Sequence, residues 1–154
     1  MAEMKHQNNG CACSEQAQCL MLKASLEEMP RFYAFTDQVC EKNNIEDPEK
    51  MEIQLSLEEL IVNVINYAYP DHSKENGIEL HFDCKEDKTF FTIIDEGIAF
   101  DPTQHEEVDT SSDIDERTIG GLGIHMVRQM MDSMSYRRSG NKNVLSLEKR
   151  INVG

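Results

Sequence analysis

The sequence predicts a two-layer α/β sandwich, in which helices cover one face of a single mixed sheet. Stretches with helical periodicity and stretches with strand alternation occur in separate runs, in the order strand, helix, helix, hairpin, loop, helix, hairpin. A length of 154 residues is enough for one domain with its own apolar core. The 39% hydrophobic and 29% charged residues are ordinary for a soluble globular protein, so nothing in the composition opposes this fold class.

The first half of the chain predicts one strand and two helices. Residues 19–26, CLMLKASL, have the composition of an edge strand. Residues 30–44 begin with proline, carry apolar side chains at helical spacing and end in two asparagines, which predicts the first helix. The second helix is predicted over residues 48–69, with Asp47 as its N-cap and Pro70 as its stop.

A hairpin and a long loop follow. Residues 77–85 and 88–95 alternate apolar and polar side chains on either side of a turn-like KEDK, which predicts two antiparallel strands. Residues 100–119 are acidic and have no period. They are too many for a simple connector, so we expect a mobile functional loop there.

The end of the chain predicts a helix and a second hairpin. Residues 121–134 carry apolar side chains, many of them methionine, at helical spacing, and we expect this stripe to face the core. Residues 134–138 and 143–151 are the closing strands, and Ser139-Gly140-Asn141 is the turn between them.

Charge and cysteine content limit the function classes. A net charge of -14 argues against a nucleic-acid-binding face and favours a basic partner surface. No apolar run could cross a bilayer and the first residues lack a signal-peptide core, so we expect a cytoplasmic protein. The five cysteines are then expected to be reduced thiols. Cys11, Cys13 and Cys19 lack CxxC spacing and are not expected to bind metal, and residues 1–18 are expected to form a flexible arm.

One polar face stands out in the second predicted helix. Glu59, Asn63 and Tyr67 are four residues apart, which stacks their side chains along one side of a largely apolar helix. A carboxylate and an amide carried inward need partners, because unpaired burial is costly. Either the core satisfies them, or they belong to a binding site.

A second polar group ends the first hairpin. Asp95 follows an apolar strand and precedes Gly97 by two residues, an arrangement that is also common in plain turns. As a site, Asp95 would accept a hydrogen bond from an exocyclic amine such as that of adenine, and Gly97 would allow close approach to a flat ring. Ile98 and Phe100 would wall the pocket.

A glycine cluster precedes the third helix. Gly120, Gly121 and Gly123 expose backbone amides at the positive end of the helix dipole, which favours an anion. The cluster matches neither a dinucleotide-binding fingerprint nor a Walker A loop. A merely flexible helix start remains the alternative.

Together the three segments resemble the N, G1 and G2 boxes of the GHKL ATPase superfamily, in the same order. Within it the chain resembles the RsbW-like anti-sigma-factor serine/threonine kinases, notably in the phrases VNVINYAYP and GGLGIHMVRQMMD. The resemblance covers nearly all of residues 19–153. It implies the Bergerat ATPase fold, with a mainly antiparallel sheet, and an ATP-binding kinase domain over residues 19–154.

The resemblance also implies roles for individual residues. Glu59 matches the catalytic glutamate that acts as general base, and Asn63 the asparagine that coordinates Mg²⁺. Asp95, with Gly97 beside it, matches the residue that reads adenine, and Gly121 and Gly123 match glycines that hold the phosphates. The remaining ATP-binding residues implied are Tyr67, Phe100, Arg117, Leu122 and Ile124. The chain departs from its relatives in two places, with Tyr67 where many have histidine and with Asn143-Val144 where many have threonine near the adenine in the last strand.

Three functions are compatible with these residues. The first is an ATP- and Mg²⁺-dependent serine/threonine kinase that phosphorylates a STAS-domain antagonist, binds a sigma factor and forms a homodimer, as the resemblance implies, without contacting membrane or nucleic acid. The second is a nucleotide-sensing module that sequesters a partner without catalysis. The third is a detached histidine-kinase catalytic domain.

Overall fold

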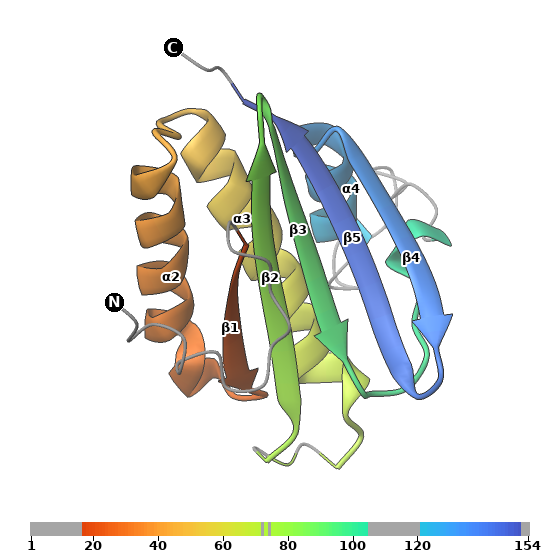
Figure 1. Ribbon diagram of the computed structural model, residues 1–154. Helices are drawn as coiled ribbons and strands as arrows, with labels where there is room; N and C mark the ends of the chain where they lie inside the picture. The colour runs from red at the N-terminus through yellow and green to blue at the C-terminus, as the bar shows by residue number, and fades with distance from the viewer. Residues whose placement is uncertain (1–16, 72, 74, 105–120, 152–154) are drawn as a thin grey trace.

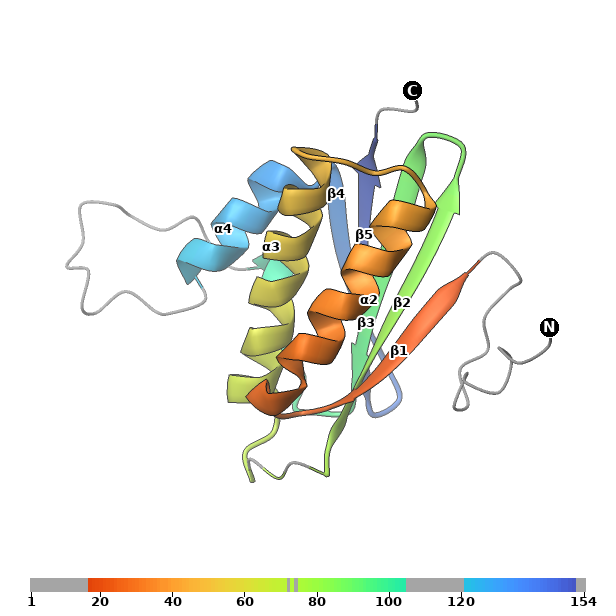
Figure 2. The same ribbon diagram turned by 90° about the vertical axis from the view of Figure 1, so that its left-hand side faces the viewer.

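The computed structural model describes residues 17–71, 73, 75–104 and 121–151, except for the side chains of Gly121 and Leu122. Within these residues a sheet forms one layer and the helices form the other (Figures 1 and 2). The strands are β1 (Gln18–Lys23), β2 (Gly77–Lys85), β3 (Lys88–Asp95), β4 (Ser133–Ser139) and β5 (Lys142–Arg150). The α-helices are α2 (Met29–Lys42), α3 (Glu49–Asn63) and α4 (Gly121–Met130).

The strand order is β1-β2-β3-β5-β4, and each neighbouring pair of these described strands is antiparallel. All three α-helices lie on the same face of the sheet, as Figure 2 shows. The predicted two-layer sandwich with a mainly antiparallel sheet is therefore confirmed, and so is the position of the first strand at the sheet edge.

The core lies between the two layers. Strand alternation turns one set of side chains towards the helices, and Ile78, Leu80 and Phe82 of β2 are almost fully buried there. Phe32 and Val39 of α2 meet them from the helical layer. The other inward side chains of this cluster come from α3, β3 and β5, and include Ile53, Leu57, Ile61, Phe91, Ile93 and Leu147.

Helix α3 differs in detail from its prediction. It begins at Glu49 after a cis Asp47–Pro48 peptide, without a side-chain cap, so Asp47 is not its N-cap. After Asn63 the chain continues as a π-helical turn, Val64–Ala68. The widened turn directs the carbonyl of Ala68 to Ile98, whose amide donates a 2.8 Å hydrogen bond to it.

Two predicted boundaries are wrong. The first strand ends at Lys23 rather than at residue 26, because Ser25 Oγ accepts the amide of Glu27 and starts a short 3₁₀ helix, Leu26–Glu28. The third helix ends at Met130, because the amide of Asp132 donates to Glu148 of β5 and the chain enters β4. Met134 therefore faces the core from a strand.

The cysteine prediction is partly wrong. Cys19 is disulfide-bonded, whereas Cys40 and Cys84 are free thiols as predicted. The predicted arm lies outside the described residues except for its last two positions, and Gln18 belongs to β1. In the part of the chain that is described, no helix combines the length and the apolar character that crossing a bilayer requires.

A buried lysine joins the two layers at the far end of β5. Lys149 Nζ donates a 2.6 Å hydrogen bond to the carbonyl of Met130, at the end of α4, and lies 2.8 Å from the Glu52 carboxylate of α3. Its side chain is only 9% exposed. The Lys149 ammonium group thus donates a hydrogen bond to the carbonyl at the end of α4 and also forms an ion pair with a carboxylate of α3.

Replacing Lys149 by Met should lower the free energy of unfolding by about 1–3 kcal/mol, because a partly buried carboxylate and a carbonyl both lose their donor. The matched control is Arg150→Met, which removes a neighbouring but exposed ion pair with Asp87 and should cost less than about 1 kcal/mol. Urea denaturation of both variants measures the difference. Equal stability of the two would contradict a structural role for the buried pair.

Candidate functional site

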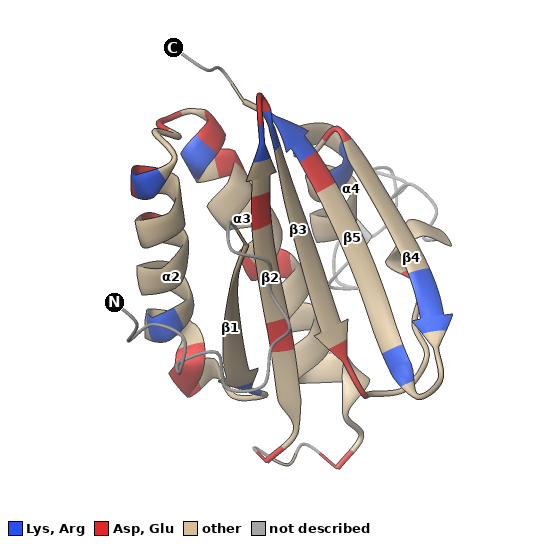
Figure 3. Cartoon of the chain, in the orientation of Figure 1, with Lys and Arg blue, Asp and Glu red and all other residues tan. Residues whose placement is uncertain are grey.

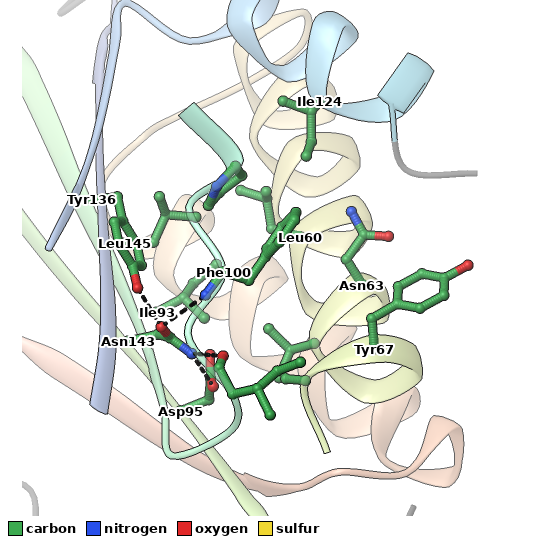
Figure 4. Close-up of a pocket in the computed structure, with 14 residues that line it drawn as sticks. Leu60, Asn63, Tyr67, Ile93, Asp95, Phe100, Ile124, Tyr136, Asn143 and Leu145 are labelled. Atoms are coloured by element: carbon green, nitrogen blue, oxygen red, sulfur yellow. Dashed lines mark hydrogen bonds between the residues drawn. The ribbon is translucent and has the colours of Figure 1, made fainter. Parts of the chain in front are cut away.

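A cavity of about 290 Å³ opens between α3, the π-helical turn and the inner face of the sheet. Apolar side chains form most of its wall, and Asp95 and Asn143 provide polar groups at its floor (Figure 4). The apolar wall includes Leu60, Ile93, Ile98, Phe100, Ile124 and Leu145. An apolar slot with a few converging polar groups is the usual form of a small-molecule site.

Asp95 is the buried acid of this cavity. It ends β3 and is only 6% exposed. Its Oδ1 accepts two hydrogen bonds, from the Gly97 amide at 2.8 Å and from Asn143 Nδ2 at 2.9 Å. No described residue donates to its Oδ2, which leaves that oxygen as an acceptor for a ligand.

Burial raises the pKa of Asp95 above the ordinary value for a carboxyl group. The hydrogen bonds from Asn143 and Gly97 oppose this rise in pKa, and so does the positive charge of Arg138. The surroundings of the carboxylate therefore partly restore the ionised form that burial disfavours.

Gly97 is held against the π-helical turn. A Cβ atom at this position would collide with the backbone carbonyl and the Cβ of Ala68. Since a carbonyl fixed in a helical turn cannot move aside as a side chain can, the loop after β3 lies this close to Ala68 only with glycine here.

Replacing Gly97 by Ala should therefore displace the loop after β3 and weaken ligand binding in the cavity by about tenfold or more, which a calorimetric titration measures. Gly140→Ala is the matched control: Gly140 has a φ of 62°, but a Cβ there would meet nothing within 4 Å. That control should lose about 1 kcal/mol of stability and keep its affinity. Equal effects of the two variants on affinity would contradict the close contact with Ala68.

Glu59 and Asn63 lie one turn apart near the end of α3, on the side that faces α4. Asn63 is buried, lines the cavity and hydrogen-bonds to the Glu59 carboxylate. Burial raises the pKa of Glu59, and the hydrogen bond from Asn63 partly offsets this. A carboxyl group with a raised pKa beside a cavity is a candidate for proton transfer.

The start of α4 closes the site beside Glu59. A Cβ atom at Gly123 would overlap the Glu59 carboxylate, so glycine here leaves room for that carboxylate against the start of α4. Ile124, the next residue, is fully buried and lines the cavity. The acid on α3 and the glycine on α4 are thus direct neighbours.

The other predicted site residues lie as follows. Tyr67 and Phe100 line the mouth of the cavity and are 51% and 43% exposed, and the Tyr67 hydroxyl points away from Asp95 (Figure 4). Gly121 and Leu122 are the first two residues of α4. Arg117, and residues 105–119 of the predicted loop, lie outside the described residues, whereas Pro102–Gln104 form a 3₁₀ turn.

Three polar residues of the last hairpin join the site: Asn143, which the family resemblance placed near the adenine, and Tyr136 and Arg138, whose contribution the sequence did not indicate. Asn143 bonds to Asp95, and its own Oδ1 accepts from the Tyr136 hydroxyl at 2.6 Å and from Arg138 at 3.1 Å. Arg138 also donates to the carbonyl of Gly97 at 2.9 Å. The only hint in the sequence is the alternation of β4, which places Tyr136 and Arg138 on one face.

Comparisons with known proteins agree with this architecture. The RsbU and RsbW domains of Rv1364c from Mycobacterium tuberculosis superpose with a TM-score of 0.59, at 13% identity, over 88% of this chain and 32% of that one. The catalytic domain of the histidine kinase ThkA superposes with a TM-score of 0.51, at 16% identity, over 89% and 99%. At these identities the likeness concerns the fold.

Sequence comparison gives relatives and a family. The serine-protein kinases RsbW of Staphylococcus aureus strains MSSA476 and JH9 are each 29% identical over 92 residues, which cover 56% of this chain and 58% of theirs. The match thus spans little more than half the length of these curated relatives. Residues 22–149, most of the chain, match the family described as the histidine kinase-like ATPase domain. The chain therefore belongs to the histidine kinase-like, or GHKL, ATPase family, and is similar to RsbW.

Proposed function

We propose that this protein is an ATP- and Mg²⁺-dependent serine/threonine protein kinase and anti-sigma factor, which phosphorylates a STAS-domain antagonist. The observation that carries the proposal is the meeting of Glu59, Asn63, Asp95 and Gly123, from α3, β3 and α4, at one place: Asn63 and Asp95 line the cavity, and Glu59 lies beside Asn63 and against Gly123. The RsbW relatives, which are named serine-protein kinases, support the reaction class.

The Asp95 end of the cavity suits an adenine base. The apolar wall would enclose the flat ring, and Oδ2 of Asp95 would accept a hydrogen bond from the exocyclic amine. Tyr67 and Phe100, half exposed at the mouth, would cover the edge of the base and the sugar. These contacts bind and orient the nucleotide without taking part in the reaction.

The other end suits the phosphates. The absence of a side chain at Gly123 leaves backbone at the start of α4 next to the acid of α3, and a helix start of this kind favours phosphate oxygens. The amide oxygen of Asn63 is of the ligand type that Mg²⁺ prefers, together with phosphates and water. When bound, Mg²⁺ would neutralise charge on the transferred phosphate.

Glu59 is the proposed general base. It lies where the nucleotide cavity meets α4, and its raised pKa brings the carboxylate nearer to the pKa range of an effective base. It would orient the serine or threonine hydroxyl of the antagonist and accept its proton. Asn63 would hold the Glu59 carboxylate through its hydrogen bond.

The test uses the full chain, [γ-³²P]ATP and STAS-domain proteins captured from the native cell extract with and without Mg-ATP. Phosphoserine or phosphothreonine on a captured STAS protein supports the proposal, and co-capture of a sigma factor supports the anti-sigma role. ATP binding without transfer would instead indicate a nucleotide-sensing module. Acid-labile phosphohistidine would indicate a histidine kinase.

A further inference from the structure

Asn143 occupies a central position in the polar floor of the cavity. It is the second residue of β5, pairs directly with Asp95 of β3 and is only 5% exposed. Its side chain takes part in five hydrogen bonds, of which the bond to Asp95 is one. An amide this fully bonded is held in one orientation.

The partners of Asn143 determine which end of its amide faces Asp95. Arg138 Nη1, at 3.1 Å, and the Phe100 amide, at 3.4 Å, can only donate hydrogen bonds, so the end of the Asn143 side chain that they contact must be oxygen. The opposite end must then be the NH₂ group. It donates to Asp95 Oδ1 at 2.9 Å and to the carbonyl of Ile98 at 2.8 Å.

This orientation fixes how the Asp95 carboxylate, which accepts hydrogen bonds at both oxygens, is turned. With the Gly97 amide, two N–H groups point at Oδ1, so any group in that position must accept there. The carboxylate is thereby rotated so that Oδ2 is left for the ligand. Arg138 adds a positive charge and also donates to the carbonyl of Gly97, which ties the loop after β3 to β4.

Arg138 belongs to a basic group at the β4–β5 hairpin of an otherwise acidic chain (Figure 3). Its neighbour Arg137 pairs with Val144 and projects from the opposite face of β4. Only one of these two adjacent arginines therefore reaches Asn143. The pair offers a matched comparison within one strand.

We propose that Asn143, oriented by Arg138, is a positioning residue that makes the site select 6-amino over 6-oxo purine nucleotides. The inference rests on the proposed function, since it concerns the same nucleotide site. Asn143 has no hydrogen-bonding group left for the base itself, so it acts through Asp95. By holding Oδ1 it fixes the direction of Oδ2. In that direction Oδ2, an acceptor, pairs with the amine of adenine and repels the carbonyl oxygen of hypoxanthine.

The experiment measures Kd for Mg-ATP and Mg-ITP by calorimetry. The wild type should prefer ATP by about a hundredfold or more, because a site built around one hydrogen-bonding group rejects its mismatch. Asn143→Leu, which keeps the shape of the side chain, should reduce that ratio about tenfold or more. Asn143→Thr restores a donor to Asp95 and should keep the ratio within about threefold of wild type.

Variants of Arg137 and Arg138, whose side chains are exposed, also test the positioning role of Asn143. Arg138→Gln should reduce the ATP:ITP ratio by about threefold or more, and Arg137→Gln should leave it unchanged. If Asn143→Leu does not fold, the ATP:ITP ratios of these two arginine variants still test the positioning role. A purely structural role would weaken both nucleotides alike and keep the ratio.

The outcomes separate the two proposals. If the wild type binds Mg-ATP selectively and both Asn143→Leu and Arg138→Gln keep its ATP:ITP ratio, the positioning role is overturned and the proposed function stands. If the wild type binds neither nucleotide, the nucleotide site itself is wrong and both proposals fail.

Discussion

Replacing Glu59 by Gln is expected to lower the rate of phosphoryl transfer by about a hundredfold or more, while the Kd for Mg-ATP changes by less than about threefold. Glutamine keeps the size and the hydrogen bond with Asn63 but cannot accept a proton from the attacking hydroxyl. Glu59 contacts the start of α4 rather than the Asp95 end of the cavity. The adenine of ATP should therefore bind to the variant as it does to the wild type. Single-turnover transfer to the STAS partner and a calorimetric titration measure the two quantities.

The neighbouring acid supplies the control. Glu58 points to the other side of α3 and hydrogen-bonds to Tyr33 of α2, outside the cavity. Glu58→Gln should therefore transfer phosphate at close to the wild-type rate above the pKa of Glu59, although losing the charge of Glu58 removes one minor cause of the rise in that pKa. Wild-type transfer by Glu59→Gln would refute its assignment as the base, and equal losses in the two variants would point to a general effect of charge on partner binding.

Glu59 should also determine how the phosphoryl-transfer rate of the wild type depends on pH. Burial raises the pKa of Glu59, so the carboxyl group becomes protonated at a higher pH than an exposed glutamate would as the pH falls. Glu59 can accept the proton of the attacking hydroxyl only while its carboxyl group is deprotonated. The transfer rate should therefore decline on the acid side through a pKa above the ordinary glutamate value, and Glu59→Gln should lack this decline.

Much of the fold could be predicted from local signals. Prolines fix boundaries directly, and Pro30 lies in the first turn of α2 while Pro70 follows the π-helical turn after α3. Alternation in β2 predicted which side chains face the core, because the strand repeat is two residues. These features depend only on near neighbours in the sequence.

Some errors were local, such as the end of β1, where Ser25 caps a short 3₁₀ helix. The others came from contacts distant in sequence. The methionine-rich stripe continues beyond Met130 without proline or glycine, so nothing local marks the point where β5 pairs with the chain and converts it into β4. The same applies to the π-helical turn, whose Ala68 carbonyl is matched to the Ile98 amide of another segment. Neither of these two pairings can be predicted from helical periodicity in the sequence.

The site was predictable to a similar extent. Glu59 and Asn63 share a helix face by spacing alone, and Asp95 stands at a strand end. Asn143 lies 48 residues from Asp95, and its place opposite that residue is set by the register of β3 with β5. The resemblance placed Asn143 near the adenine, but because a one-residue slip would put it on the other face, its hydrogen bond to Asp95 follows only from the folded sheet.

Replacing Asp95 by Asn is expected to weaken Mg-ATP binding by about a hundredfold or more and to improve Mg-ITP binding at the same time. Two N–H groups point at Oδ1, from Gly97 and Asn143, so the new side chain must place its carbonyl oxygen there. Its NH₂ group then faces the cavity, where it repels the amine of adenine and pairs with the 6-oxo group of hypoxanthine. Calorimetric titration with both nucleotides measures this inversion.

The fold should tolerate this change. Because burial raises the pKa of Asp95, the native state binds its proton more tightly than the unfolded chain does, and wild-type stability falls as the pH rises from the ordinary carboxyl pKa through the raised one. Asp95→Asn should remove that fall and leave the protein at least as stable at neutral pH. Denaturant titrations at several pH values measure it, which separates lost affinity from lost structure.

Asp132→Asn is the control for removing one carboxylate charge. Asp132 Oδ2 accepts the amide of Arg150 at 2.6 Å, away from the cavity, so neither nucleotide should change in affinity. If Asp95→Asn lowers the affinities for ATP and ITP equally, the carboxylate contributes charge or structure rather than a directed acceptor. An exchange of preference would show that the donors around Oδ1 dictate which purine the cavity takes.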